Sequence, residues 1–160
     1  MQIDINKVCS IAKEAGKAIL TVYDGDHAVE YKDDKSPLTA ADKASHDVIV
    51  AGLQKHFPEI PILSEEGADI PYEERKDWSR FWCVDPLDGT KEFIKRNGEF
   101  TVNIAFIEEG RPVAGVVYVP VQDKLFFGSS GAGCWRLGAG GEKEQIRVRQ
   151  ANQESGLTVV

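Results

Sequence analysis

Two aspartates, Asp85 and Asp88, flank a proline in the segment WCVDPLDGTKEF. Carboxylates three residues apart, across a turn that proline stiffens, can converge on one hard cation, and the Leu87 carbonyl lies between them. Gly89 and Thr90 then begin an expected short helix, where glycine lets the backbone approach a ligand and free N–H groups can hold a phosphate. The segment predicts a metal and a phosphate at one turn, although a plain capped turn uses the same residue types.

Further carboxylates lie at the ends of two other expected elements. Glu65 and Glu66 end a strand, and Asp42 lies in the first turn of a helix. Taken alone, the glutamates are more simply a solvated pair and Asp42 a favourable charge at a helix start. Together with Asp85 and Asp88, however, these carboxylates would destabilise the fold by mutual repulsion, because two unit charges ~4 Å apart repel by about 4 kcal/mol at an effective dielectric near 20. Bound cations would remove this penalty.

The donor atoms of this set are all oxygen, which favours Mg²⁺ or Mn²⁺ over zinc. The three histidines are scattered along the chain: His27, His46 and His56. His46 lies one helical turn after Asp42, but packing or surface exposure is its more ordinary role. The glycine-rich segment at 128–133 matches no phosphate-binding loop pattern, so a turn is expected there.

Composition narrows the class of protein. The 160 residues include 19 Lys and Arg against 26 Asp and Glu, a formal charge of -7, and 42% are hydrophobic, which suits one folded domain. The negative charge argues against a nucleic-acid binder and requires bound cations to recruit an anionic substrate. Cys9, Cys83 and Cys134 form no C-x-x-C pair, which indicates a reducing cytosol. No stretch approaches the ~18 apolar residues of a membrane span.

The hydrophobic pattern predicts an α+β fold, a layered sandwich with two long helices and a largely antiparallel sheet. Apolar residues recur every three or four positions over residues 4–23 and about 39–57, which predicts the helices. The run FWCV at 81–84 predicts a strand buried on both faces. Further strands are expected at 60–64, twice within 101–120, and at 124–130, 133–137 and 145–150.

Shorter segments complete this outline. A short helix is expected at about 91–96, a polar surface segment at 68–80 and a strand within 28–31. The three tryptophans, Trp78, Trp82 and Trp135, are expected in the core. The apolar run that closes residues 151–160 indicates the first residues of another strand, so the chain is expected to be the leading portion of a longer protein.

Three segments in order resemble the inositol-monophosphatase superfamily of Mg²⁺-dependent, lithium-sensitive phosphatases: SPLTAAD at 36–42, LSEEG at 63–67 and DPLDGTKEFI at 85–94. The Lys-Glu-Phe after Asp-Gly-Thr is similar to the bacterial 3′(2′),5′-bisphosphate nucleotidases of that superfamily. The resemblance implies a sugar-phosphatase type of sandwich and removal of the 3′-phosphate of adenosine 3′,5′-bisphosphate to give AMP, in sulfur assimilation and nucleotide recycling.

The resemblance also implies roles for individual residues. Two or more Mg²⁺ ions would be bound by Glu65, Asp85, Asp88 and the Leu87 carbonyl. The substrate would contact Glu65, Leu87, Asp88, Gly89 and Thr90. Asp42 would pair with Thr90 to orient and activate the attacking water.

One departure from the superfamily concerns a later metal-binding aspartate, which follows a tryptophan in its Trp-Asp-x-Ala motif. None of the three tryptophans here precedes an aspartate. Residues 1–160 are therefore expected to be the N-terminal metal-binding portion, with the final metal-binding aspartate absent. An inositol monophosphatase and a non-catalytic metal- or nucleotide-binding fragment stay open as alternatives.

The expected partner is a small nucleotide, with no nucleic acid. The resemblance implies a cytoplasmic enzyme that can contact the inner membrane peripherally, although no amphipathic basic stripe supports that contact. The oligomeric state is left open.

Overall fold

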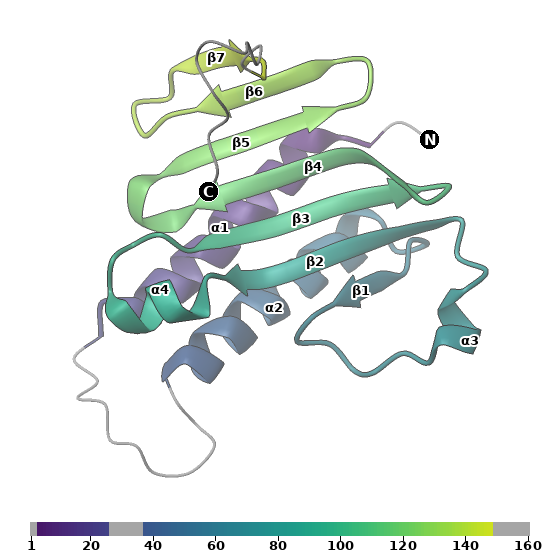
Figure 1. Cartoon of the computed structure of the whole chain (residues 1–160), viewed down its shortest axis with the longest axis horizontal. Helices are drawn as coiled ribbons and strands as arrows, with labels where there is room; N and C mark the ends of the chain where they lie inside the picture. Colours follow the sequence, from purple (N-terminus) through teal and green to yellow (C-terminus); the bar gives the residue numbers. More distant parts are fainter. Residues whose placement is uncertain (1–2, 26–36, 149–160) are drawn as a thin grey trace, which may run out of the picture.

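The structure is a computed structural model that describes residues 3–25 and 37–148. A seven-stranded sheet forms one layer, and the helices α1 (Ile5–Tyr23) and α2 (Pro37–His56) pack side by side against one of its faces (Figure 1). The arrangement confirms the predicted α+β class, with two long helices and a largely antiparallel sheet.

The strands follow one another across the sheet in chain order. The first pair is parallel and every later pair is antiparallel. The strands are β1 (Ile62–Ser64), β2 (Arg80–Asp88), β3 (Thr101–Glu108), β4 (Arg111–Val119), β5 (Lys124–Ser129), β6 (Gly133–Leu137) and β7 (Lys143–Ile146). The connections contain three short helices: α3 (Tyr72–Arg75), α4 (Thr90–Lys95) and the 3-10 turn η1 (Pro120–Gln122).

Both long helices begin with a recognisable signal. The side chain of Asp4 accepts a hydrogen bond from the Asn6 N–H at 3.2 Å and caps α1. Helix α2 begins at Pro37, two residues earlier than expected, because proline suits the first helical position. Asp42 therefore lies in the second turn of α2 rather than the first, where a helix dipole no longer explains its charge.

The core lies between the helices and the sheet. Alternate residues of β2 and β3 face α1 and α2, and Trp82, Ile104 and Phe106 among them are almost fully buried. At one end of the sheet, the rings of Tyr23, Phe93 and Phe100 pack in tilted and edge-on contacts, with centroids 5.1–5.4 Å apart. This aromatic cluster fixes α4 beside the end of β2, where the acidic segment lies.

Several expectations about burial were wrong. The strand at 81–84 is not buried on both faces: Trp82 and Val84 face the helices, whereas Cys83 is exposed on the opposite face, against which no described element packs. The segment at 60–64 becomes a three-residue edge strand that is half-buried, since β1 has a neighbour on one side only among the strands that the structure describes. Of the tryptophans only Trp82 is core; Trp78 and Trp135 are half-buried.

The remaining expectations concern the connecting segments and the residues near the ends of the described ranges. The polar segment at 68–80 is mostly exposed and contains α3, which the sequence did not predict. Strand β7 begins at Lys143, earlier than expected. The predicted strands within 28–31 and 151–160, together with Ser36 and His27, lie outside the described residues.

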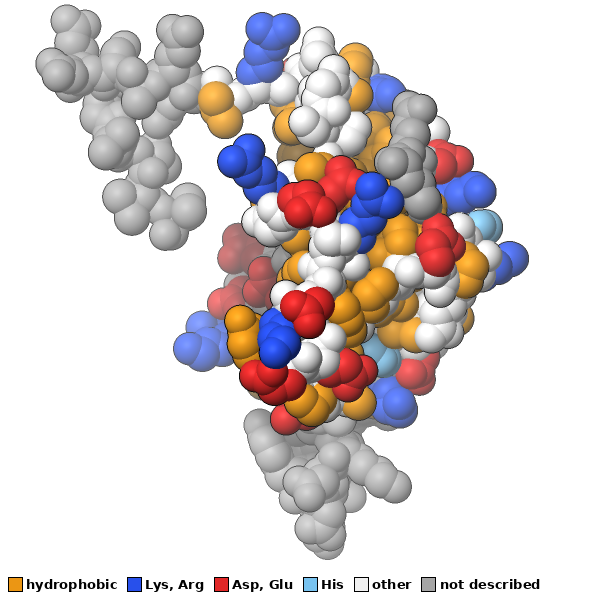
Figure 2. Space-filling model, turned by 90° about the vertical axis from the view of Figure 1, so that its right-hand side faces the viewer, with side chains coloured by type: hydrophobic (Ala, Val, Ile, Leu, Met, Phe, Trp, Pro, Cys, Tyr) orange, Lys and Arg blue, Asp and Glu red, His pale blue; other side chains and the backbone are white. Residues whose placement is uncertain are grey.

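Two features of the molecule concern contact with a membrane: the length and apolarity of its helices, and the distribution of charged side chains on its surface. No helix within the described ranges combines the length and apolarity needed to cross a bilayer. On the face shown in Figure 2, Lys and Arg side chains are interspersed with Asp, Glu and hydrophobic ones rather than gathered into a basic patch.

Candidate active site

The aspartates of the DPLD segment lie at the end of a bulged strand. Asp85 pairs with Asn103 and Asp88 with Thr101, so three steps along β2 match two along β3. The sequence predicted a turn directly after residue 84, but β2 continues through Asp88 because the bulge accommodates the extra residue. Leu87 is 2% exposed and anchors the bulge in the core.

A short polar chain holds Asp88. The Asn103 side-chain amide donates to Asp88 Oδ2 at 3.0 Å, and the Thr101 hydroxyl donates to Asn103 Oδ1 at 3.1 Å. Neither Asn103 nor Thr101 was predicted from the sequence as a partner of Asp88. The period-two pattern of β3 does place Thr101 and Asn103 on one face, but only the register with β2 shows that they meet Asp88.

The backbone after Asp88 turns sharply into α4. Gly89 adopts φ 99°, and a Cβ at this position would lie 3.1 Å from the Glu99 carbonyl oxygen. Only glycine fits such a conformation at such a close approach. Thr90 is then the first residue of α4, and α4 contacts α2, the helix that carries Asp42. The predicted pairing of Asp42 with Thr90 stays a prediction.

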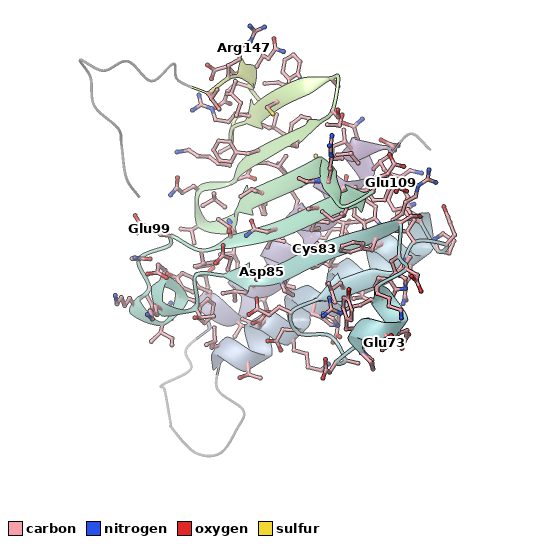
Figure 3. All side chains as sticks on the ribbon, turned by 45° about the vertical axis from the view of Figure 1, so that its right-hand side comes forward. Glu73, Cys83, Asp85, Glu99, Glu109 and Arg147 are labelled. Atoms are coloured by element: carbon pink, nitrogen blue, oxygen red, sulfur yellow. The ribbon has the colours of Figure 1, made fainter. Side chains whose placement is uncertain are left out.

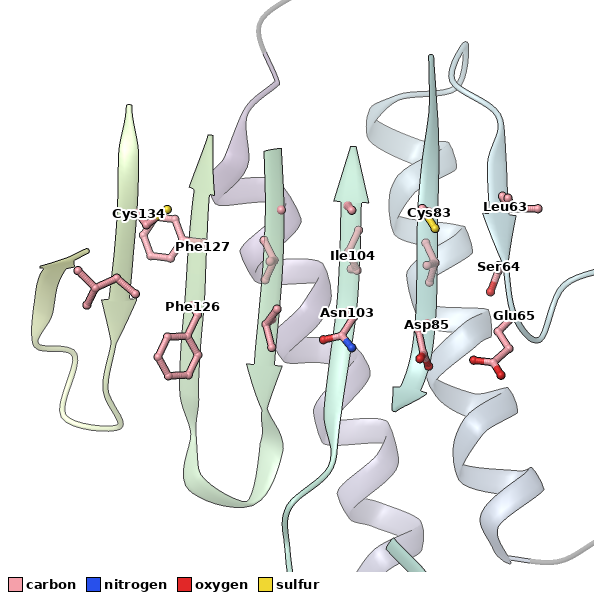
Figure 4. Close-up of a pocket in the computed structure, with 16 residues that line it drawn as sticks. Leu63, Ser64, Glu65, Cys83, Asp85, Asn103, Ile104, Phe126, Phe127 and Cys134 are labelled. Atoms are coloured by element: carbon pink, nitrogen blue, oxygen red, sulfur yellow. The ribbon is translucent and has the colours of Figure 1, made fainter. Parts of the chain in front are cut away.

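The glutamates occupy a tight turn directly after β1. The Gly67 N–H donates to the Ser64 carbonyl at 3.0 Å, which makes Glu65 and Glu66 the central residues of a β-turn. The Glu65 N–H donates to the Val84 carbonyl at 3.1 Å. The parallel pairing of β1 with β2 thus places Glu65 beside Asp85, at the same end of the two strands (Figure 4).

The neighbouring carboxyls perturb the acidity of Asp85. Burial raises the pKa of Asp85 to about 6, helped by the charges of Glu65 and Asp88 and by a hydrogen bond shared with Glu65. The Leu87 N–H donates to Asp85 and opposes this shift in part. The charges of the sequence-predicted Glu65 and Asp88 therefore lie close enough to act on Asp85.

Asp42 joins the same cluster from the helix layer. Its side chain is 9% exposed, and burial raises its pKa to about 7, with further contributions from the charge of Glu66, the charge of Asp85, a hydrogen bond with Glu66 and the charge of Glu65. Glu66, for which the sequence predicted no separate role, is thus an acidic neighbour of Asp42. The cluster brings α2, the β1 turn and the β2 bulge together.

The donor set fits a hard cation. The Oδ1 atoms of Asp42 and Asp85 are both buried without a hydrogen-bond partner in the protein, and such atoms carry a desolvation cost that a bound ion would offset. All the candidate donors are oxygen, as Mg²⁺ requires. Across residues 3–25 and 37–148, no three His, Cys, Asp or Glu side chains are already grouped as ligands of one ion. The predicted metal set of Glu65, Asp85, Leu87 and Asp88 therefore stays a prediction.

Two members of the cluster, Glu65 and Asp85, face the side of the sheet opposite α1 and α2, on which no described element packs. A groove of about 690 Å³ extends from Glu65 and Asp85 across the strands toward β6 and β7, and apolar side chains such as Phe126 line most of it (Figure 4). Asp85 and the exposed Cys83 both lie on this side of β2 (Figure 3). The acidic end of the groove is polar and the remainder is apolar, which suits a ligand with a charged and an uncharged part.

A comparison of the sequence with models of known protein families identifies the family that has this arrangement. The family model described as the inositol monophosphatase family matches residues 3–160. The chain belongs to the inositol monophosphatase family. This membership accounts for the order in which the family's acidic segments occur along α2, β1 and β2.

Within the inositol monophosphatase family, the chain is similar to proteins named 3′(2′),5′-bisphosphate nucleotidase CysQ. It is 55% identical to that of Salmonella typhimurium and 52% identical to that of Escherichia coli K12, in each case over 150 residues. Each alignment covers 92% of this chain and 59% of the relative. The chain thus spans about three fifths of the length of these relatives.

Solved structures of the family show the same fold. The crystal structure of CysQ from Bacteroides thetaiotaomicron, a bacterial member of the family, superposes with a TM-score of 0.82 at 40% identity, covering 92% of this chain and 58% of that one. An inositol monophosphatase from Zymomonas mobilis superposes with a TM-score of 0.75 at 30% identity, covering 93% and 54%. The predicted sandwich of the sugar-phosphatase type is confirmed.

Proposed function

We propose that the protein is a Mg²⁺-dependent phosphomonoesterase that removes the 3′-phosphate of adenosine 3′,5′-bisphosphate to give AMP. The observation that carries the proposal is the convergence of three acidic segments: Asp42 and Asp85 each keep a buried carboxylate oxygen without a hydrogen-bond partner, and the charge of Glu65 reaches both of them. The likeness to bisphosphate nucleotidases supports the choice of substrate. A cytoplasmic location, consistent with three free cysteines, is part of the proposal.

Two or more Mg²⁺ ions would be held by Glu65, Asp85, Asp88 and the Leu87 carbonyl. When bound, they would supply Lewis acidity toward the phosphoryl oxygens and lower the pKa of a coordinated water. Asn103 holds Asp88 in one orientation, and the Leu87 side chain fixes the bulge from the core side. These contacts would keep the ligands in place before the substrate arrives.

Asp42 and Thr90 would act on the attacking water. The Asp42 carboxylate would accept a proton from the Thr90 hydroxyl, which in turn would accept one from water. The N–H groups of Gly89 and Thr90 would hold the phosphate at the start of α4. The water oxygen would then bond to phosphorus in line with the ribose 3′-oxygen, and as the P–O bond breaks that oxygen would leave and take a proton from solvent water to become the 3′-hydroxyl of AMP.

A substrate panel tests the proposal. With Mg²⁺ present, phosphate release from adenosine 3′,5′-bisphosphate should exceed release from inositol 1-phosphate and from AMP by at least about tenfold in kcat/KM. Chelation of Mg²⁺ should abolish it. A preference for inositol phosphates would replace the nucleotidase by an inositol monophosphatase, and binding of the bisphosphate without release would favour a non-catalytic fragment.

A further inference from the structure

A hydrogen bond ties the turn of the two glutamates to helix α2. His46 Nδ1 and Ser64 Oγ lie 2.8 Å apart, and both side chains are partly buried. A hydroxyl both donates and accepts, so this bond forms with either tautomer of the imidazole. Ser64 is the last residue of β1 and the first residue of the turn, so the bond to His46 fixes the residue at which the turn begins.

Among the described residues, the turn is also tied to the sheet by the backbone bond from the Glu65 N–H to the Val84 carbonyl. Strand β1 is three residues long and lies at the edge of the sheet, and β2 is its one partner among the described strands. The packing around the turn is close: a Cβ at Gly67 would lie 3.0 Å from the Ser64 carbonyl oxygen and 3.8 Å from His46 Cε1. A side-chain bond at Ser64 therefore contributes substantially to where Glu65 and Glu66 lie.

The adjacent residue of α2 holds the other acidic segment. Ser45 is fully buried, and its hydroxyl donates to the Pro86 carbonyl at 2.8 Å. Pro86 lies within the β2 bulge between Asp85 and Asp88, where the regular ladder with β3 is interrupted. The Ser45 hydroxyl thus satisfies a carbonyl in the bulge and fixes the bulge against α2.

Ser45 and His46 follow Asp42 by three and four residues, so all three side chains lie on the same face of α2. We infer that Ser45 and His46 are positioning residues, which hold the Pro86 bulge and the Ser64 turn at fixed distances from Asp42 and thereby set the affinity of the acidic cluster for Mg²⁺. This inference rests on the proposed function. Neither residue touches the reacting atoms in this account.

Calorimetric titration with Mg²⁺ tests the inference without any assay of turnover. His46→Ala and Ser64→Ala should each weaken Mg²⁺ binding by about 10- to 100-fold, as removal of a residue that supports metal ligands does. Their double variant should bind no more weakly than either single one, because both remove the same bond. His46→Asn, whose amide can reach Ser64, should restore most of the affinity.

Further variants separate positioning from folding. Ser45→Ala should also weaken Mg²⁺ binding about tenfold, while a thermal melt checks that the protein stays folded. His56→Ala, an exposed histidine at the end of the same helix, should bind Mg²⁺ like the wild type. At saturating Mg²⁺, the kcat of His46→Ala should return to within about threefold of the wild-type value, because the ligands themselves are intact.

The outcomes distinguish this inference from the proposed function. Wild-type Mg²⁺ affinity in His46→Ala and Ser64→Ala would overturn the positioning role, whatever substrate the protein hydrolyses. Weakened Mg²⁺ binding in both variants would support it even if the substrate panel shows another phosphate ester to be preferred. A wild-type protein that binds no Mg²⁺ would overturn both.

Discussion

Replacing Asp88 by asparagine is expected to abolish Mg²⁺ binding and phosphate release together. The amide preserves the shape of the side chain and can still contact Asn103, but it removes the negative charge that a divalent cation needs. Metal ions contribute several kcal/mol of transition-state stabilisation, and each 1.36 kcal/mol is about tenfold in rate, so kcat should fall by at least about 10³-fold. Calorimetry with Mg²⁺ and phosphate release measure the two losses separately.

Asp47→Asn is the matched control. Asp47 is exposed on α2 and pairs with Lys43 at 3.4 Å, outside the acidic cluster, so the variant changes the net charge by the same amount. It should retain the Mg²⁺ affinity and the kcat of the wild type. If Asp88→Asn kept even a tenth of the wild-type turnover, Asp88 could not be a required ligand.

Replacing Asp42 by asparagine is expected to lower turnover by about 10²- to 10⁴-fold while stabilising the metal-free protein at alkaline pH. The loss of turnover follows from removing a general base. The gain in stability follows from the raised pKa of Asp42, because its carboxylate is buried near Glu66 and Asp85.

The direction of the pH dependence can be derived from that pKa. The unfolded Asp42 loses its proton near pH 3.8 and the folded one near pH 7, so between these values the folded state binds more protons. The free energy of unfolding of the metal-free protein should therefore fall as pH rises from about 4 to 7, by at most about 1.4 kcal/mol per pH unit for this group. Urea unfolding with EDTA at pH 5 and pH 8 should show a smaller fall for Asp42→Asn than for the wild type.

Thr90→Ala separates the two effects. It should lower turnover like Asp42→Asn but leave the pH dependence of unfolding unchanged, because Thr90 carries no charge. An Asp42→Asn protein whose unfolding keeps the full wild-type pH dependence would show that Asp42 is not buried among the other carboxyls.

The sequence predicted the parts of this fold that local chemistry determines. Periodicity located the helices, and the residue types of the DPLDGT and SEEG segments indicated their chemistry. The relation between those segments depends on contacts that are distant in the chain. Ser45 meets Pro86 across 41 residues, and Asn103 meets Asp88 across 15.

Two further features lay beyond local patterns. The bulge at Pro86 and Leu87 appears only in the register between β2 and β3, so the sequence suggested a turn instead. The exposure of Cys83 depends on which face of the sheet is covered, and an apolar run of four residues does not contain that information.

Anomalous diffraction from crystals grown with Mn²⁺ in place of Mg²⁺ tests the central claim most directly, because it locates the ion itself. The predicted result is two or more anomalous peaks among Glu65, Asp85 and Asp88, with a carboxylate oxygen of each of these residues and the Leu87 carbonyl about 2.1 Å from at least one ion. A well-ordered acidic cluster without a peak, or a peak bound only by other residues, would contradict the account.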